Sequence, residues 1–204
     1  MIPNTLQTPV CGAHGDAQKW TIARRLATRT RRVVSEAGLR PAAVVVPLVP
    51  SAQGLTILLT RRTDEVEHHK GEICFPGGRV DPEDADHLAA ALREAREEVG
   101  IFPEHLSVLG PLDDFVSTSG YRVRPFAAIL NHRDYPFLAA PREVAEILLI
   151  PTDHLLDPAN HEISPHAAGT AAHRFLWKQR VVWGMTASIL DHFLRVALPR
   201  GVEE

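Results

Sequence analysis

The chain has 204 residues, of which 45% are hydrophobic and 23% are charged. This length and balance suit one globular core and exclude a chain that is disordered throughout. The net charge of −3 excludes the strongly basic surface that nucleic-acid binding requires, and no run of about 18 or more apolar residues is present to span a membrane.

The N-terminal segment and the cysteines bear on domain organisation and compartment. Residues 1–19 contain prolines and glycines without a periodic apolar pattern, which favours a flexible leader before a single domain at 20–204. Cys11 and Cys74 imply no disulfide framework, and the first residues lack the charged start and apolar run of an export signal. We therefore expect a cytoplasmic protein.

Apolar periodicity predicts the remaining elements in chain order. Helical spacing over 20–37, ended by Gly38, is followed by two β-branched runs that predict strands joined by a turn. A glycine-rich, charged loop at 61–83 leads to a second helix. The predicted elements are helices at 20–37, 84–99 and 185–198 and strands at 42–49, 55–60, 106–112, 121–130, 143–150 and 173–183. This order describes a mixed sheet covered by helices. The arginines of the first helix are typical of a solvated face; they are Arg24, Arg25, Arg29, Arg31 and Arg32.

Three carboxylates cluster near the end of the second predicted helix. Glu94, Glu97 and Glu98 lie three or four residues apart, which predicts that they project from one face. We expect the opposite face to hold the helix against the sheet through its apolar residues, which are Leu88, Leu92, Ala95 and Val99. Clustered carboxylate oxygens suit a hard cation such as Mg²⁺. An exposed acidic face with internal ion pairs is an equal alternative on this observation alone.

The segment before this helix, residues 71–81, is rich in glycine. Glycine permits close backbone approach and positive φ, and Pro76 stiffens the segment. Such a loop can present backbone amides to phosphate groups. Its position directly before the acidic helix favours catalysis over a solvated acidic surface.

Residues 93–101 read Arg-Glu-Ala-Arg-Glu-Glu-Val-Gly-Ile and resemble the signature of the Nudix hydrolases, Arg-Glu-apolar-any-Glu-Glu-any-Gly-apolar. An acidic residue earlier in that signature corresponds to Asp84, and the intervening loop is one residue longer than in the general pattern. Coenzyme A diphosphatases of this family share the longer loop. Their upstream motif is also similar to residues 58–78, in which Leu-Leu-Thr-Arg-Arg-Thr, Gly71 and Phe-Pro-Gly-Gly keep the subgroup spacing. Glu67 stands where the subgroup has an arginine.

The resemblance implies an α/β fold, the α/β/α sandwich of Nudix proteins with a mixed sheet between helices. It implies hydrolysis of coenzyme A or acyl-coenzyme A to adenosine 3′,5′-bisphosphate and 4′-phosphopantetheine or its acyl form. Mg²⁺, with Mn²⁺ as a substitute, would bind Glu94, Glu98 and Glu97, and Arg93 would orient these carboxylates. The residues implied in substrate binding are Arg61, Arg62, Gly71, Phe75, Pro76, Gly77 and Gly78.

A general base outside the helix is a separate question. Our candidate is Glu143, at the start of a predicted strand, although a surface role is the commoner one for such a residue. The histidines, including His161 and His173, form no zinc-like spacing with the cysteines, so we expect them at the surface or the edge of the core.

Other functions stay open at this point. The charge at Glu67 favours, as an alternative, another small nucleotide substrate such as ADP-ribose, NADH or a dinucleoside polyphosphate. A module that keeps the fold and only senses a nucleotide is a further alternative, which the full set of carboxylates disfavours. We expect no nucleic-acid or membrane partner, and a homodimer is left open because isologous pairing is the commonest oligomeric arrangement.

Overall fold

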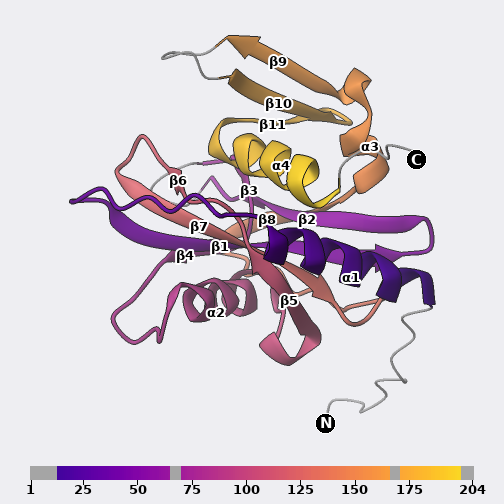
Figure 1. The fold of residues 1–204 in the computed structure, drawn as a ribbon, viewed down its shortest axis with the longest axis horizontal. Helices are drawn as coiled ribbons and strands as arrows, with labels where there is room; N and C mark the ends of the chain where they lie inside the picture. Colours follow the sequence, from indigo (N-terminus) through magenta and orange to yellow (C-terminus); the bar gives the residue numbers. More distant parts are fainter. Residues whose placement is uncertain (1–12, 65–69, 166–170, 199–204) are drawn as a thin grey trace.

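A computed structural model describes residues 13–64, 70–165 and 171–198 (Figure 1). Its centre is a mixed sheet in which the strands follow the order β3-β2-β1-β7-β5, with β8 and β4 paired to β2 and β1 and with β6 paired to β7. The strands of this sheet are β1 (Arg40–Ser51), β2 (Gly54–Arg62), β3 (Ile73–Cys74), β4 (Gly77–Arg79), β5 (Leu106–Pro111), β6 (Phe115–Val116), β7 (Tyr121–Leu130) and β8 (Val144–Pro151).

Strand β1 pairs with a neighbour on each side. It runs parallel to β7, from the pair Arg40 and Tyr121 to the pair Leu48 and Ile129, and antiparallel to β2 through a tight turn. β1 is therefore central, and its run of apolar residues is buried on both faces, as expected for a strand covered by helices on two sides.

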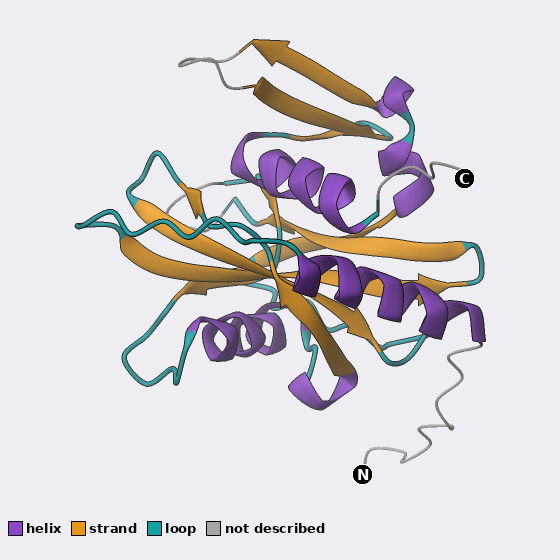
Figure 2. Ribbon diagram, in the orientation of Figure 1, coloured by secondary structure: helices purple, strands orange, loops and turns teal. Residues whose placement is uncertain are grey.

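Helices cover both faces of the sheet (Figure 2). Alternate residues of β1 divide between two cores, because successive strand residues point to opposite faces. Val46 and Leu48 pack with α1 (Ala13–Thr28) and α4 (Gly184–Ala197), whereas Val45 packs with α2 (His87–Val99). This arrangement confirms the predicted α/β/α sandwich.

A second, three-stranded antiparallel sheet lies beside α4, away from the central sheet (Figure 1). The predicted strand at 173–183 is in fact a hairpin of two strands, because the chain reverses at Lys178, which has a φ of 53°. The chain reaches this sheet through α3 (Thr152–Leu156) and η2 (Pro158–Asn160), and the strands are β9 (His161–Pro165), β10 (Ala171–Trp177) and β11 (Arg180–Val182).

The first helix differs from its prediction. It begins at Ala13, inside the predicted leader, and ends at Thr28 rather than near residue 37. Beyond it, residues 29–36 form neither helix nor strand, and Arg29 and Arg31 form ion pairs with Asp113 and Asp114. These arginines are thus not a solvated helical face.

A short helix, η1 (Pro103–His105), precedes β5. Within the described residues, no helix has the length and apolar character needed to cross a membrane.

Candidate active site

Helix α2 carries the predicted carboxylates and is fixed at both ends. The Asp86 side chain caps its N-terminus by accepting the Ala89 N–H at 2.8 Å, and Gly100, with a φ of 70°, ends it in the left-handed conformation. The buried face is made of small residues that let the helix approach the sheet closely, namely Ala90, Ala91, Ala95 and Val99. Leu88 and Leu92, expected to anchor the helix, are only partly buried.

The three carboxylates do not share one exposed face, which corrects the sequence prediction. The exposed fraction of the side chain is 59% for Glu97, 17% for Glu94 and 4% for Glu98. The reason is helical spacing: Glu98 lies seven residues after Ala91 and three after Ala95, on the same buried stripe. Glu98 therefore lies within the packed interface between α2 and the sheet.

The negative charge of Glu98 is only partly balanced by its neighbours. Its Oε1 lies 3.8 Å from Nη1 of Arg62, and Gly77 donates its backbone N–H to the carboxylate. Its Oε2 is buried with no hydrogen-bond partner among the described residues. Burial, followed by the negative charge of Glu94, raises the pKa of Glu98 to about 8.

The neighbouring carboxylate shows the same imbalance. Burial raises the pKa of Glu94, and the charges of Glu97 and Glu143 act in the same direction, against the lowering effect of Arg93. Glu98 is buried and Glu94 is half-buried, their charges repel each other, and one oxygen of Glu98 has no hydrogen-bond partner among the described residues, so the pair would be stabilised by additional positive charge. A divalent cation with oxygen ligands supplies that charge, so these residues fit a metal such as Mg²⁺.

Arg93 links the helix to the preceding segment. Its Nε and Nη2 donate to the two carboxylate oxygens of Asp84, each at 3.0 Å, in a forked pair. Its Nη1 donates to Glu94 at 2.9 Å and to Glu97 at 3.1 Å. The hydrogen bond from Arg93 holds the pKa of Asp84 below its usual value. Arg93 thus restrains Glu94 and Glu97 from one side, and Asp84, known from the sequence only as a motif position, fixes Arg93.

The glycine-rich segment is not an open loop. Residues 77–79 form β4, which pairs antiparallel with β1, and the amide of Gly77 is used by Glu98. A Cβ on Gly77, whose φ is 154°, would overlap the carbonyl of Ala43, while a Cβ on Gly78 would stand 2.5 Å from Oε1 of Glu94. The glycines are therefore required for close packing on β1 and on the carboxylate.

Two of the predicted substrate-binding residues, Phe75 and Pro76, are buried. Phe75 is 3% exposed within the larger core, and Pro76 is also buried, with its carbonyl accepting the Val45 N–H at 2.9 Å. Both side chains therefore pack in the interior, and a part of these residues in substrate binding stays a prediction. Gly71, with a φ of 68°, occupies the turn before β3. Glu67 lies outside the described residues.

The two arginines of β2 point to different partners. A β-bulge separates Arg61 from Arg62, and Nε of Arg61 lies 3.5 Å from Oε2 of Glu146 on β8, whereas Arg62 faces Glu98. Of these two arginines, Arg62 is therefore the one that lies close to the buried carboxylate of Glu98.

Glu143 is exposed immediately before β8, and its carbonyl accepts the Thr63 N–H at 2.9 Å. Its charge raises the pKa of both Glu94 and Glu98, so it lies within electrostatic range of the pair. A role of Glu143 as general base stays a prediction.

Comparison with known proteins decides the family. The sequence model of the NUDIX domain matches residues 38–180. The chain belongs to the Nudix family. Relatives from Yersinia pestis and Yersinia pseudotuberculosis, both described as the uncharacterized Nudix hydrolase NudL, are 37% identical over 156 residues, covering 75% of this chain and 77% of each relative. The chain is accordingly a Nudix hydrolase, an enzyme that cleaves phosphoric anhydride bonds.

A solved structure has a similar fold. The crystal structure of a Deinococcus radiodurans protein aligns with a TM-score of 0.50 at 20% identity, covering 79% of this chain and 88% of that one. At this identity the likeness concerns the arrangement of helices and strands alone.

Proposed function

We propose that this Nudix hydrolase cleaves the diphosphate linkage of a nucleotide derivative, with Mg²⁺ or Mn²⁺ held by Glu94, Glu98 and Glu97. The observation that carries the proposal is the buried Oε2 of Glu98, which has no hydrogen-bond partner among the described residues and lies in the field of Glu94. A bound divalent ion supplies charge neutralisation to the diphosphate and activates water as a nucleophile.

The protein residues around this site have separable roles. Arg93 is a positioning residue, since both ends of its guanidinium are engaged by Asp84 and by Glu94. Arg62 faces Glu98 without a close hydrogen bond to it, so its guanidinium can turn to a substrate phosphate once Glu98 has another partner. Gly77 and Gly78 keep the backbone close enough for the carboxylates to stay in place.

Glu143 is our proposed proton acceptor. It is exposed, whereas Glu98 is almost fully buried, so a proton taken up by Glu143 can pass directly to solvent. The effect of its charge on the pKa of Glu94 and Glu98 supports this role. A general base must reach the attacking water directly or through one intermediate water.

The proposed substrate is coenzyme A or acyl-coenzyme A. The support is the spacing of the motif over residues 58–78 together with the longer segment between Gly78 and Arg93, features similar to the coenzyme A diphosphatases. The products would be adenosine 3′,5′-bisphosphate and 4′-phosphopantetheine, or its acyl form. Glu67, which replaces an arginine of that subgroup, favours ADP-ribose, NADH or a dinucleoside polyphosphate as the second candidate class.

A substrate panel tests this proposal. Purified enzyme would be incubated with coenzyme A, acetyl-coenzyme A, ADP-ribose, NADH and a dinucleoside polyphosphate, each with Mg²⁺ or Mn²⁺, and the products separated by chromatography. We expect the highest kcat/KM with coenzyme A or its acyl form, and loss of turnover in E98Q. The matched control is E162Q, which removes the charge of an exposed glutamate on β9 that pairs with Arg174.

The outcomes test the choice of substrate separately from metal-dependent diphosphate hydrolysis. Preferred hydrolysis of another member of the panel would refute coenzyme A while leaving the metal-dependent diphosphatase intact. Absence of hydrolysis with every member would contradict the whole proposal. If coenzyme A is preferred, E67R should raise its kcat/KM, because the variant restores the cation of the subgroup.

A further inference from the structure

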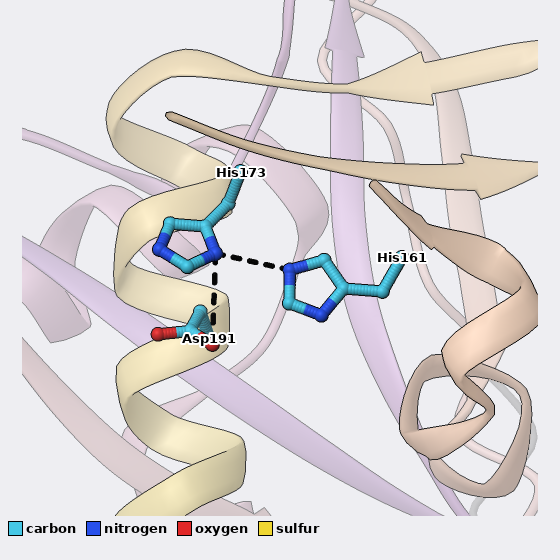
Figure 3. Close-up of side chains that lie close together, drawn as sticks. All are labelled: His161, His173 and Asp191. Carbon is cyan, nitrogen blue, oxygen red and sulfur yellow. Dashed lines mark hydrogen bonds and ion pairs between the residues drawn. The ribbon is translucent and has the colours of Figure 1, made fainter. Parts of the chain in front are cut away.

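A second cluster of metal-binding side chains lies outside the carboxylate site, between the small sheet and α4. His161 on β9, His173 on β10 and Asp191 on α4 point toward one another (Figure 3). One ligand atom from each residue lies within 4.8 Å of those of the other two. From the sequence, these histidines are expected at the surface or the edge of the core, because they form no zinc-like spacing with the cysteines.

The strand register explains why the histidines meet. His161 pairs directly with Phe175, and His173 stands two residues from Phe175 on the same strand. Residues two apart share a face of a sheet, so the two histidines are diagonal neighbours on one face. The ring of His161 also stacks on fully buried Phe175 at 4.1 Å between centroids. That face is the one turned toward α4 in Figure 3.

Asp191 is an unusual residue for its position. It is 8% exposed on the packing face of α4, among residues such as Leu190 and Leu194. A buried carboxylate is costly unless it is paired or ligates a metal. Oδ2 of Asp191 accepts from Nε of Arg195 at 2.8 Å, while Oδ1 is directed at His173, 3.7 Å from its Nδ1.

The distances suit a tetrahedral cation. Nε2 of His161 and Nδ1 of His173 lie 3.0 Å apart, and Nδ1 of His173 lies 3.7 Å from Oδ1 of Asp191. Ligands about 2.0–2.1 Å from zinc in a tetrahedron are separated by about 3.3 Å. The observed separations lie on either side of this value, so small side-chain rotations would bring the ligand atoms to it.

We propose that His161, His173 and Asp191 bind a zinc-class divalent cation that fastens the small sheet to α4. Two imidazole nitrogens and one carboxylate oxygen suit Zn²⁺ or Co²⁺, whereas Mg²⁺ prefers oxygen ligands alone. The site is chemically distinct from Glu94 and Glu98, which offer only carboxylate oxygens. Three protein ligands leave a fourth position for water.

The same geometry has a metal-free alternative. Two imidazole nitrogens 3.0 Å apart can share one proton, with one ring as donor and the other as acceptor. A proton and a divalent cation cannot occupy this position together, because the metal requires both lone pairs. Metal titration therefore separates the two arrangements.

The test uses the full chain, freed of metal by a chelator and then placed in excess Mg²⁺ to occupy the catalytic carboxylates. Co²⁺ titration followed by visible absorption should give the intense bands of a tetrahedral site at about one equivalent. Zn²⁺ should abolish these bands and raise the Tm of the protein, because it binds only the folded state. In H173Q and D191N the bands and the Zn²⁺-dependent rise in Tm should both be lost.

Two further variants locate the cation. H132A removes one ring of a different histidine pair, His105 and His132, whose ring centroids lie 5.2 Å apart. Neither residue belongs to the cluster of metal-binding side chains found among the described residues. This variant should keep the bands. E98Q should keep them too. Loss of the bands in E98Q, their persistence in H173Q, or their absence from the wild-type chain would overturn the proposal. If H173Q fails to fold, loss of the bands in D191N with their retention in H132A and E98Q still locates the cation, and their absence from the wild-type chain still overturns the proposal.

Discussion

Gly78 lies directly against the carboxylate of Glu94, so that a Cβ atom on residue 78 would stand 2.5 Å from Oε1 and 2.6 Å from Cδ. G78A should therefore displace this carboxylate from the proposed metal site. A misplacement of about 1 Å at a reacting group can reduce turnover about 100-fold, and we expect a fall in kcat of that order with little change in Tm.

A double-mutant cycle with E94D provides the control. Aspartate is shorter by one methylene and leaves room for the new Cβ, so G78A should cost less activity in the E94D background than in the wild type. Additive losses in the cycle would contradict a direct clash between the two residues.

R93K should weaken metal binding without unfolding the protein. Lysine cannot reproduce the forked pair with Asp84 while also reaching Glu94. Loss of an outer positioning group typically costs about 10–100-fold in metal affinity or activity, and the apparent affinity for Mg²⁺ from initial rates measures it. R96K is the matched control, because Arg96 is exposed on the same helix and lies over the ring of Phe102. Equal effects of the two substitutions would refute the role of Arg93.

The sequence identified the elements whose periodicity is long. β1, β2, β7, α2 and α4 were predicted close to their observed bounds because their apolar residues repeat over many positions. β3 and β4 are two and three residues long, too short for any period to show, and their pairing depends on β2 and β1. The hairpin within 173–183 was missed because Lys178 is not a residue typical of positive φ.

The sequence predicted which carboxylates form the candidate site but not which of them is buried. Spacing of three and four residues places Glu94, Glu97 and Glu98 near one another, yet residues 97 and 98 are about 100° apart around the helix. Which of them faces the sheet depends on the alanine stripe and on the packing of α2 against β1. The meeting of His161, His173 and Asp191 depends on strand register and on α4, which no local pattern encodes.

The buried carboxylate makes the stability of the metal-free enzyme depend on pH. Burial and Glu94 raise the pKa of Glu98 from 4.5 to about 8, so between these values the folded state binds more protons than the unfolded state. The free energy of unfolding should therefore fall as pH rises from about 4.5 to about 8. Thermal melts in EDTA measure this fall, which should be smaller in E98Q and unchanged in E162Q. An identical pH dependence in E98Q and the wild type would contradict the burial of an ionisable Glu98.

A second carboxylate should stabilise the fold. Asp114 is fully buried and accepts hydrogen bonds from Arg31 at 2.7 Å and from Arg124 at 2.9 and 3.1 Å. Burial alone would raise the pKa of Asp114, but the hydrogen bonds from Arg124 and the Val34 amide, with the arginine charges, lower it overall.

D114N should reduce the free energy of unfolding by about 3 kcal/mol at pH 7, because it leaves the half-buried guanidinium groups of Arg31 and Arg124 without their anion. Since the pKa of Asp114 is depressed, this contribution is present at neutral pH and is lost as pH falls below about 4. Urea melts of D114N and of D134N, which alters an exposed aspartate, measure the difference. A loss that persists undiminished at acid pH would argue against the ion pairs as its source.

The most direct test of the central claim, that Glu98 is a buried ligand of the catalytic cation, is the initial rate of E98Q against the Mg²⁺ concentration. The assay would use the substrate preferred in the panel, with wild type and E162Q in parallel. We expect kcat to fall about a thousandfold or more in E98Q, with no recovery at high Mg²⁺, while E162Q matches the wild type. Full activity of a folded E98Q at the same Mg²⁺ concentration would contradict the account.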